Sequence, residues 1–235
     1  MTKKILITGA NGQLGHEMRN ALKGNNRFEC IFTDVAELDI CNAEAVKQII
    51  ADNHIDYIVN CAAYTQVDKA EDNAELCKKI NTDAVENLAR AAATYGARMI
   101  HISTDYVFNG RGYRPYTEDV VPDPQSVYGS TKLEGEKILT DICPESIIIR
   151  TAWLYSPYGN NFVKTMLHLG EEREELSVVA DQIGTPTCAA DLAQAILVIL
   201  QADTFVPGTY HFSDEGACSW YDFTVTIHRL AGITT

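Results

Sequence analysis

A glycine-rich turn directly after an apolar N-terminal segment constrains this chain more than any other feature of its sequence. Residues 4–8 form a short apolar run, and Gly9, Gly12 and Gly15 follow it in a G-x-x-G-x-x-G spacing. The first glycine permits a tight turn, the second lets a pyrophosphate approach the backbone, and the third lets helix and strand pack closely. The turn therefore predicts a dinucleotide site between a first strand and a first helix, and the alternative is a tight turn without a ligand.

Short apolar runs alternate with segments of helical period through the first 150 residues. The expected strands are residues 4–8, 29–33, 57–60, 99–102 and 146–150, and the expected helices are 13–22, 43–52, 84–95 and 127–140. This alternation predicts the α/β class, with a Rossmann-type doubly wound parallel sheet covered by helices on both faces. Ligands of such sheets bind at the carboxyl ends of the strands.

The alternation of expected strands and helices ends at residue 150. Residues 153–161 are rich in Gly, Pro, Asn and Tyr, which predicts a long loop. Further helices are expected over 162–170, 190–201 and 220–231. We therefore expect a dinucleotide-binding domain over residues 1–150 and a smaller C-terminal substrate-binding lobe over 151–235. The helical pattern stops close to residue 235, so a truncated C-terminus is one interpretation.

Composition and charge exclude several classes of protein. The net charge of −13 repels phosphate backbones, so nucleic acid is not an expected partner. The seven cysteines are widely spaced without a C-x-x-C motif, which indicates reduced thiols and a cytoplasmic protein. The sequence contains neither a signal peptide pattern nor an apolar stretch of the ~18 residues that a membrane span needs. The histidines show no metal-ligand spacing, so we expect no metal site.

An acidic residue follows the second expected strand, about twenty residues after the glycines. At this place the carboxylate of Asp34 can accept hydrogen bonds from the adenosine ribose, and the alternative is a carboxylate that caps a turn. Asp39 and Ile40 are candidates for contact with the adenine ring, and close packing is the alternative for the small residues after the third strand. The candidate cofactor-binding set is Gly9, Asn11, Gly12, Gln13, Leu14, Gly15, Asp34, Asp39, Ile40, Cys61, Ala62, Ala63 and Tyr64.

Tyr128 and Lys132 are spaced i and i+4, so they point from the same face of the expected helix. A free tyrosine has a pKa near ~10, and a nearby ammonium lowers that pKa. The pair is therefore a candidate general acid for carbonyl reduction. Thr104 ends the fourth strand and could hydrogen-bond the same carbonyl oxygen. The alternatives are a tyrosine packed under an exposed lysine and a threonine that caps a turn.

Motifs spread along the whole chain carry a resemblance to a known family. The resemblance rests on residues 9–15 (GANGQLG), 59–65 (VNCAAYT), 67–71 (VDKAE), 103–110 (STDYVFNG), 128–132 (YGSTK), 150–153 (RTAW), 159–162 (GNNF) and 181–186 (DQIGTP). Together these segments resemble the extended short-chain dehydrogenase/reductase superfamily and, within it, the dTDP-4-dehydrorhamnose reductase family. The resemblance covers essentially the whole chain.

The resemblance implies the roles of individual residues. It implies Thr104, Tyr128 and Lys132 as the catalytic set, with Tyr128 and Lys132 also contacting the cofactor, and Asn81 as an active-site asparagine. It implies NADPH or NADH as cofactor, a nucleotide-sugar ketone as substrate, and a monomer or homodimer. Trp153 would pack on the sugar, and a core tryptophan is the alternative. The implied substrate-binding set is Thr65, Asp105, Phe108, Trp153, Asn161 and Gln182.

Three other interpretations stay open at this stage. Some members of the family bind magnesium through glutamates at a dimer contact. Glu17 matches one of these positions, but residues 188–190 lack a second glutamate, so we expect no such metal. The second interpretation is an epimerase or dehydratase of the same fold. Tyr106 argues against the dehydratase, because such an enzyme carries a glutamate at this position. A non-catalytic regulatory subunit would not need Thr104, Tyr128 and Lys132.

Overall fold

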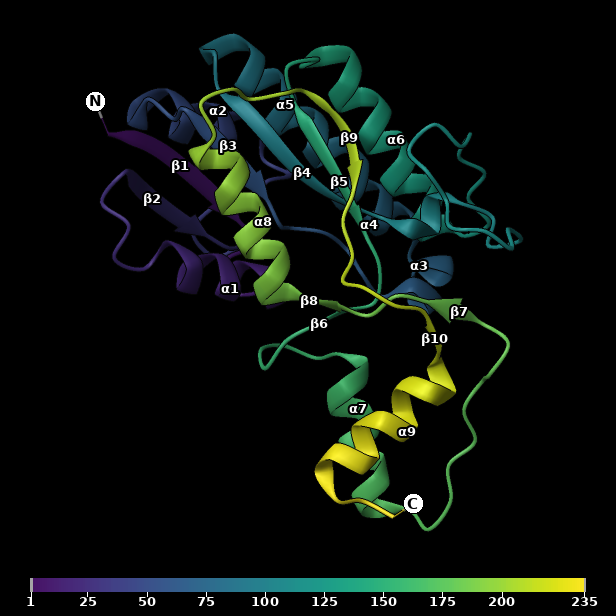
Figure 1. Cartoon of the computed structure of the whole chain (residues 1–235). Helices are drawn as coiled ribbons and strands as arrows, with labels where there is room; N and C mark the ends of the chain where they lie inside the picture. The colour runs from purple at the N-terminus through teal and green to yellow at the C-terminus, as the bar shows by residue number, and fades with distance from the viewer. Residues whose placement is uncertain (1, 235) are drawn as a thin grey trace.

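Figure 1 shows the computed structural model of the chain, which describes residues 2–234. Six parallel strands form the main sheet in the order β2-β1-β3-β4-β5-β9. They are β1 (Lys3–Thr8), β2 (Phe28–Thr33), β3 (Tyr57–Asn60), β4 (Arg98–Thr104), β5 (Ile147–Thr151) and β9 (Gly208–His211). The predicted α/β class and doubly wound parallel sheet are thus confirmed.

Helices cover both faces of this sheet. One face carries α1 (Gln13–Leu22) and α8 (Ala189–Gln201), and the other carries α2 (Ala43–Asn53), α5 (Ala84–Tyr95) and α6 (Val127–Ile142). Shorter elements lie between β3 and α6: α3 (Val67–Asp72), α4 (Ala74–Lys78), a π-helical segment (Lys79–Asp83) and a 3-10 turn (Asp105–Val107). The strands are apolar on both sides, as parallel strands buried between two helical layers must be.

Two apolar cores separate the sheet from its helical layers. Leu6, Ile58 and Met99 face the α2/α5/α6 side, where Ile50 and Leu88 fill the same cluster. On the other side, the strand residues Ile5, Ile7, Val59 and Ile149 meet Leu14, Met18, Ile196 and Leu200 of α1 and α8. This alternation along each strand fixes the register of the sheet, because a shift by one residue would exchange its two faces.

The helix over residues 189–201 lies on the sheet, although the sequence placed it in the smaller lobe. Its residues Leu192, Ala193 and Ile196 are fully buried against the core that includes α1. The strand β9 that follows was not predicted, and it extends the sheet beside β5. The prediction was wrong because a helical period shows that one face is buried but not which neighbour buries it.

A smaller lobe lies below the sheet in Figure 1 and consists mainly of α7 (Phe162–Glu172) and α9 (Trp220–Ala231). Two short strand pairs lie beside it: β6 (Leu154–Tyr155) with β8 (Thr187–Cys188), and β7 (Ile183–Gly184) with β10 (Cys218–Ser219). Ser219 starts α9 with a capping box that also uses Asp222. Within residues 2–234, no helix is long and apolar enough to cross a membrane.

Candidate active site

The glycine turn packs tightly against the end of β3. Gly9 has a φ of +64°, and a Cβ added there would lie 2.6 Å from the Ala62 nitrogen. A Cβ on Gly15 would lie 2.3 Å from the Gly9 oxygen. Gly12 precedes α1 as its N-cap without a side-chain cap, so the amides of the first turn are oriented for an anion. This cradle fits the pyrophosphate of a dinucleotide.

Asp34 lies beside this turn at the end of β2. Its carboxylate accepts hydrogen bonds from the backbone nitrogens of Asn11, at 2.9 Å, and Val35, at 2.8 Å. These bonds are those of a turn-capping residue. The side chain is only partly buried, so the protein does not enclose the carboxylate completely.

Two other residues of the candidate cofactor set are buried in the apolar core. Leu14 is 4% exposed within the cluster between the sheet and α1, and Ile40 is 7% exposed within the cluster on the opposite face. Asp39 is exposed and accepts a hydrogen bond from the Cys41 nitrogen. Packing therefore accounts for Leu14 and Ile40, and turn formation accounts for Asp39.

The structure brings Thr104 and Tyr128 together at the carboxyl end of β4. Ser126 caps α6 by accepting from the Gly129 nitrogen at 3.1 Å, which places Tyr128 in the first turn of that helix. The hydroxyl of Thr104 donates to Asp105 at 3.1 Å and accepts from the Tyr106 nitrogen at 3.2 Å, and the Tyr128 side chain lies beside it. The Tyr128 ring is 9% exposed and contacts the Tyr106 ring edge-on at 5.5 Å.

Burial sets the titration of these groups. It raises the pKa of Tyr128, an effect that the neighbouring Thr104 hydroxyl opposes and that Asp105, Tyr106 and Cys77 reinforce. Burial also raises the pKa of Asp105 to about 6, although hydrogen bonds from Thr104 and the backbone stabilise its charged form.

Our expectation that the lysine lowers the pKa of Tyr128 was wrong for this arrangement. The amine of Lys132 donates to the Ile102 carbonyl at 2.6 Å and lies 3.3 Å from Nε2 of His101. Burial lowers the pKa of Lys132 itself to about 8, and the charge of Glu136 opposes this shift. Because the amine is held against β4, desolvation outweighs any charge effect on the phenol.

Asn81 organises the wall beside Tyr128. Its side chain accepts from the Tyr64 nitrogen at 2.9 Å and donates to the Tyr64 oxygen at 3.1 Å. The same amide lies 3.4 Å from the hydroxyl of Thr131, the residue before Lys132. Asn81 therefore ties the loop after β3 to α6, and its side chain is used within the protein.

The structure joins predicted cofactor and substrate residues through Asn161 and Gln13. The amide of Asn161 donates to Gln13 at 2.9 Å and to the Ser156 oxygen at 2.8 Å, while its oxygen caps α7 at Lys164. Residues 148 positions apart thus meet where the sheet and the smaller lobe adjoin. The other substrate candidates differ: Thr65 and Gln182 are exposed, and Phe108 is buried.

Phe108 packs against three side chains from neighbouring segments. Its ring stacks on Tyr116 at 4.5 Å and meets His211 edge-on at 5.6 Å, and the Arg150 guanidinium lies 5.3 Å from the ring centre. At 7% exposure, the ring fixes the loop after β4 to the strand pair β5/β9. Phe108 therefore shapes the loop that carries Asp105.

Trp153 is held in an unusual conformation between two neighbours. Its φ is +49°, and its indole stacks on Trp220 with ring centres 3.4 Å apart and planes inclined by 12°. On β7, a Cβ added to Gly184 would lie 2.4 Å from the indole. Trp153 is only partly buried. Its packing against Trp220 is therefore compatible with a contact to a sugar.

Gly184→Ala is expected to displace the Trp153 indole. Overpacking of this kind costs about 1–3 kcal/mol in stability. Since the chain has two tryptophans and they stack on each other, near-ultraviolet circular dichroism reports the change directly. Gly170→Ala is the control, because it crowds His228 in the same lobe without touching Trp153. An unchanged tryptophan spectrum in Gly184→Ala would contradict the expected displacement.

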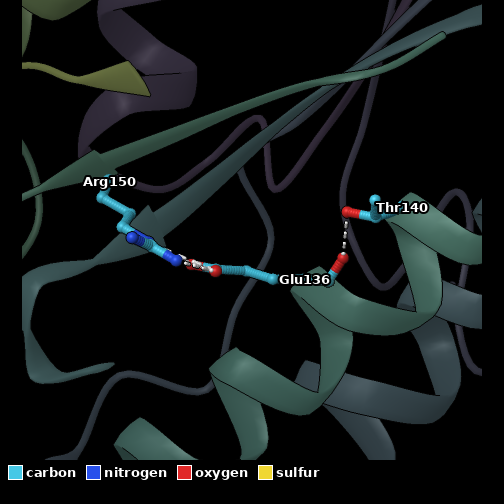
Figure 2. Close-up of polar contacts among 3 residues, drawn as sticks. All are labelled: Glu136, Thr140 and Arg150. Carbon is cyan, nitrogen blue, oxygen red and sulfur yellow. Dashed lines mark hydrogen bonds and ion pairs between the residues drawn. The ribbon is translucent and has the colours of Figure 1, made fainter. Parts of the chain in front are cut away.

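The sequence reasoning missed a buried ion pair next to the site. Arg150 on β5 donates through Nε and Nη2 to the Glu136 carboxylate on α6, at distances from 2.6 to 3.2 Å (Figure 2). The backbone oxygen of Glu136 accepts from Thr140 at 2.9 Å. The sequence offered two signals for this pair. Arg150 is a charged residue inside an apolar strand, and Glu136 lies on the same helix face as Lys132.

Glu17, the one residue that matched a metal position, is 7% exposed and accepts a hydrogen bond from Asn20 at 3.1 Å. Among residues 2–234, no group of three or more His, Cys, Asp or Glu side chains is arranged to hold a metal ion.

The chain matches a known protein family over almost its whole length. The family described as "RmlD substrate binding domain" matches residues 3–235. The chain belongs to the RmlD substrate binding domain family. A dTDP-4-dehydrorhamnose reductase of Aggregatibacter actinomycetemcomitans is 44% identical over 228 residues, which cover 95% of this chain and 78% of that protein.

Solved structures of RmlD-type proteins agree with this assignment. The dTDP-4-dehydrorhamnose reductase of Clostridium acetobutylicum is 52% identical, with a TM-score of 0.94 over 98% of this chain and 81% of that one. The Bacillus anthracis dTDP-4-dehydrorhamnose reductase in complex with NADP is 43% identical, with a TM-score of 0.96 over 100% of this chain and 83% of that one. The expected family is thus confirmed.

Proposed function

We propose that this protein reduces the C4 ketone of dTDP-4-dehydro-L-rhamnose to the alcohol of dTDP-L-rhamnose, with NADH or NADPH as reductant. The observation that carries the proposal is the proximity of the Thr104 and Tyr128 side chains, which lie at the carboxyl end of the sheet with the glycine cradle. The similarity to named dTDP-4-dehydrorhamnose reductases supports the substrate.

The chain supplies proton transfer and positioning. A nicotinamide bound along the glycine cradle supplies the hydride. Tyr128 donates its phenolic proton to the oxygen that becomes an alkoxide, and Thr104 hydrogen-bonds the same oxygen. Because burial raises the pKa of Tyr128, its proton is retained across the neutral range until a stronger base develops. Lys132 would have to exchange its bond to the Ile102 carbonyl to reach the nicotinamide ribose, while Trp153 and Asn161 border the sugar.

Consumption of NADH or NADPH with dTDP-4-dehydro-L-rhamnose tests this proposal. One equivalent of reduced cofactor should be consumed per sugar reduced, and the purified protein should be largely free of nicotinamide. An epimerase would retain its cofactor through oxidation and re-reduction. Conversion of the sugar without added reductant, or tightly bound NAD, would support the epimerase or dehydratase. Cofactor binding without any sugar conversion would support a regulatory subunit.

Asp34→Ala is expected to shift cofactor preference toward NADPH. The carboxylate repels a 2′-phosphate and favours free ribose hydroxyls. We therefore expect kcat/KM for NADPH relative to NADH to rise about tenfold, which corresponds to ~1.4 kcal/mol. The variant also loses the bond to the Asn11 nitrogen, so Tm should be measured alongside. An unmoved cofactor ratio would mean that Asp34 only caps its turn.

A further inference from the structure

A line of buried polar side chains crosses three neighbouring strands and ends at Lys132. The register pairs Thr8 with Asn60 and Asn60 with His101, on β1, β3 and β4. Thr8 donates to Asn60 at 2.6 Å, the Asn60 amide lies 3.0 Å from Nδ1 of His101, and Nε2 of His101 lies 3.3 Å from the Lys132 amine. All four side chains are at most 1% exposed.

The hydrogen bonds determine which nitrogen of His101 carries the proton. The oxygen of Asn60 accepts from the Thr8 hydroxyl and from the Ala62 nitrogen, so its NH2 group faces His101. Nδ1 of His101 must then accept. Burial and the charge of Lys132 lower the pKa of His101 well below its usual range, so the ring is neutral. A neutral imidazole that accepts at Nδ1 carries its hydrogen on Nε2.

This tautomer places an N–H group against the amine of Lys132. An ammonium has three donors and no acceptor, whereas a neutral amine has a lone pair. The Nε2–H of His101 can therefore donate only to the neutral form, and that form still donates to the Ile102 carbonyl at 2.6 Å. If Lys132 were an ammonium, the Nε2–H of His101 would face another donor, and the free energy of the charged form would be higher.

The charged groups around Lys132 oppose this stabilisation of the neutral amine but do not cancel it. Glu136 on α6 and Cys77 on α4 favour the ammonium, but burial is the larger effect and the pKa falls to about 8. The Glu136 carboxylate is also held by Arg150 from β5. From β4 the amine meets the titratable ring of His101 and the uncharged Ile102 carbonyl, and Asn60 from β3 is uncharged.

We propose that His101 is a positioning residue, which Asn60 holds as the Nε2–H tautomer and which fixes both the orientation and the protonation equilibrium of Lys132. The inference rests on the proposed function for the role of Lys132 in turnover. It predicts that His101 keeps the lysine titrating close to the working pH, so that Lys132 can exchange a proton during the reaction cycle.

The test is the titration of Lys132 by carbon-13 NMR in protein labelled at the lysine ε-carbons, with Lys132→Met assigning the signal. The wild-type midpoint should be near 8. His101→Leu should raise it by at least about one pH unit, because the neutral amine loses its donor. His101→Gln should restore the wild-type midpoint, since its amide can accept from Asn60 and donate to Lys132. Met99→Leu, on the same face of β4, should leave it unchanged.

Activity gives an independent readout. The alkaline limb of kcat/KM for the nucleotide sugar should move upward with the midpoint in His101→Leu and return in His101→Gln. A wild-type midpoint near the free lysine value of about 10 would overturn the proposal without any variant. An unchanged midpoint in His101→Leu, or an equal shift in Met99→Leu, would also overturn it. If the wild type does not reduce the sugar, the proposed function fails while the NMR titration still decides the role of His101.

Discussion

Tyr128→Phe is expected to lower kcat by about 100-fold or more, because it removes the general acid and leaves the ring in place. The ring contacts Tyr106 and lies in a small apolar cluster with Ala70 and Cys77, and phenylalanine keeps these contacts. NADH affinity, measured by fluorescence titration, should change by less than about twofold, since no cofactor-contacting charge is altered. Stability should also change little, because phenylalanine keeps the ring contacts.

Tyr106→Phe is the matched control for this experiment. Tyr106 is the neighbouring tyrosine, its side chain is 41% exposed, and its ring keeps the edge-on contact without its hydroxyl. Its turnover should stay close to that of the wild type. If Tyr128→Phe retained more than about a tenth of wild-type kcat, another group would have to protonate the alkoxide. An equal loss in Tyr106→Phe would instead point to a disturbed ring pair.

The fold around the cofactor could be predicted because its signals are local. Gly9 and Gly15 occur where an added Cβ would strike the backbone, so few other sequences fit this turn. Each of the first five strands carries several apolar residues, which fits strands with helices on both faces. Tyr128 and Lys132 share a helical face by spacing alone.

The remaining features depend on contacts that sequence spacing does not reveal. β9 is four residues long and is defined by its pairing with β5. Burial raises the pKa of Tyr128, and a bond to the Ile102 carbonyl fixes the Lys132 amine; both arise from the packing of α6 on β4. The partner of a charged residue in a strand, such as Arg150, is likewise set by the helix that packs on it.

Arg150→Met is expected to destabilise the protein by about 3–5 kcal/mol, because it leaves the Glu136 carboxylate buried without its partner. The two side chains are 7% and 4% exposed and make three hydrogen bonds (Figure 2). Glu136→Gln should destabilise it by a similar amount, because the guanidinium then stays buried beside a neutral amide. Urea unfolding at neutral pH, with m-values compared, measures the free energy of unfolding in each variant.

The double variant Glu136→Met/Arg150→Met separates the worth of the pair from the penalty of breaking it. Replacing both charges by apolar side chains of similar volume removes both desolvation costs, so it should recover most of the stability lost in either single variant. Lys47→Met is the exposed control: its partner Glu44 is 77% exposed, and the loss should be below about 1 kcal/mol. If Arg150→Met cost no more than Lys47→Met, solvent would have to reach the Glu136 carboxylate, and the packing of α6 on β5 would be looser than the structure shows. Glu136 lies one turn after Lys132 on α6. The same result would therefore mean that the helix face carrying the candidate catalytic lysine is also packed more loosely than the structure shows.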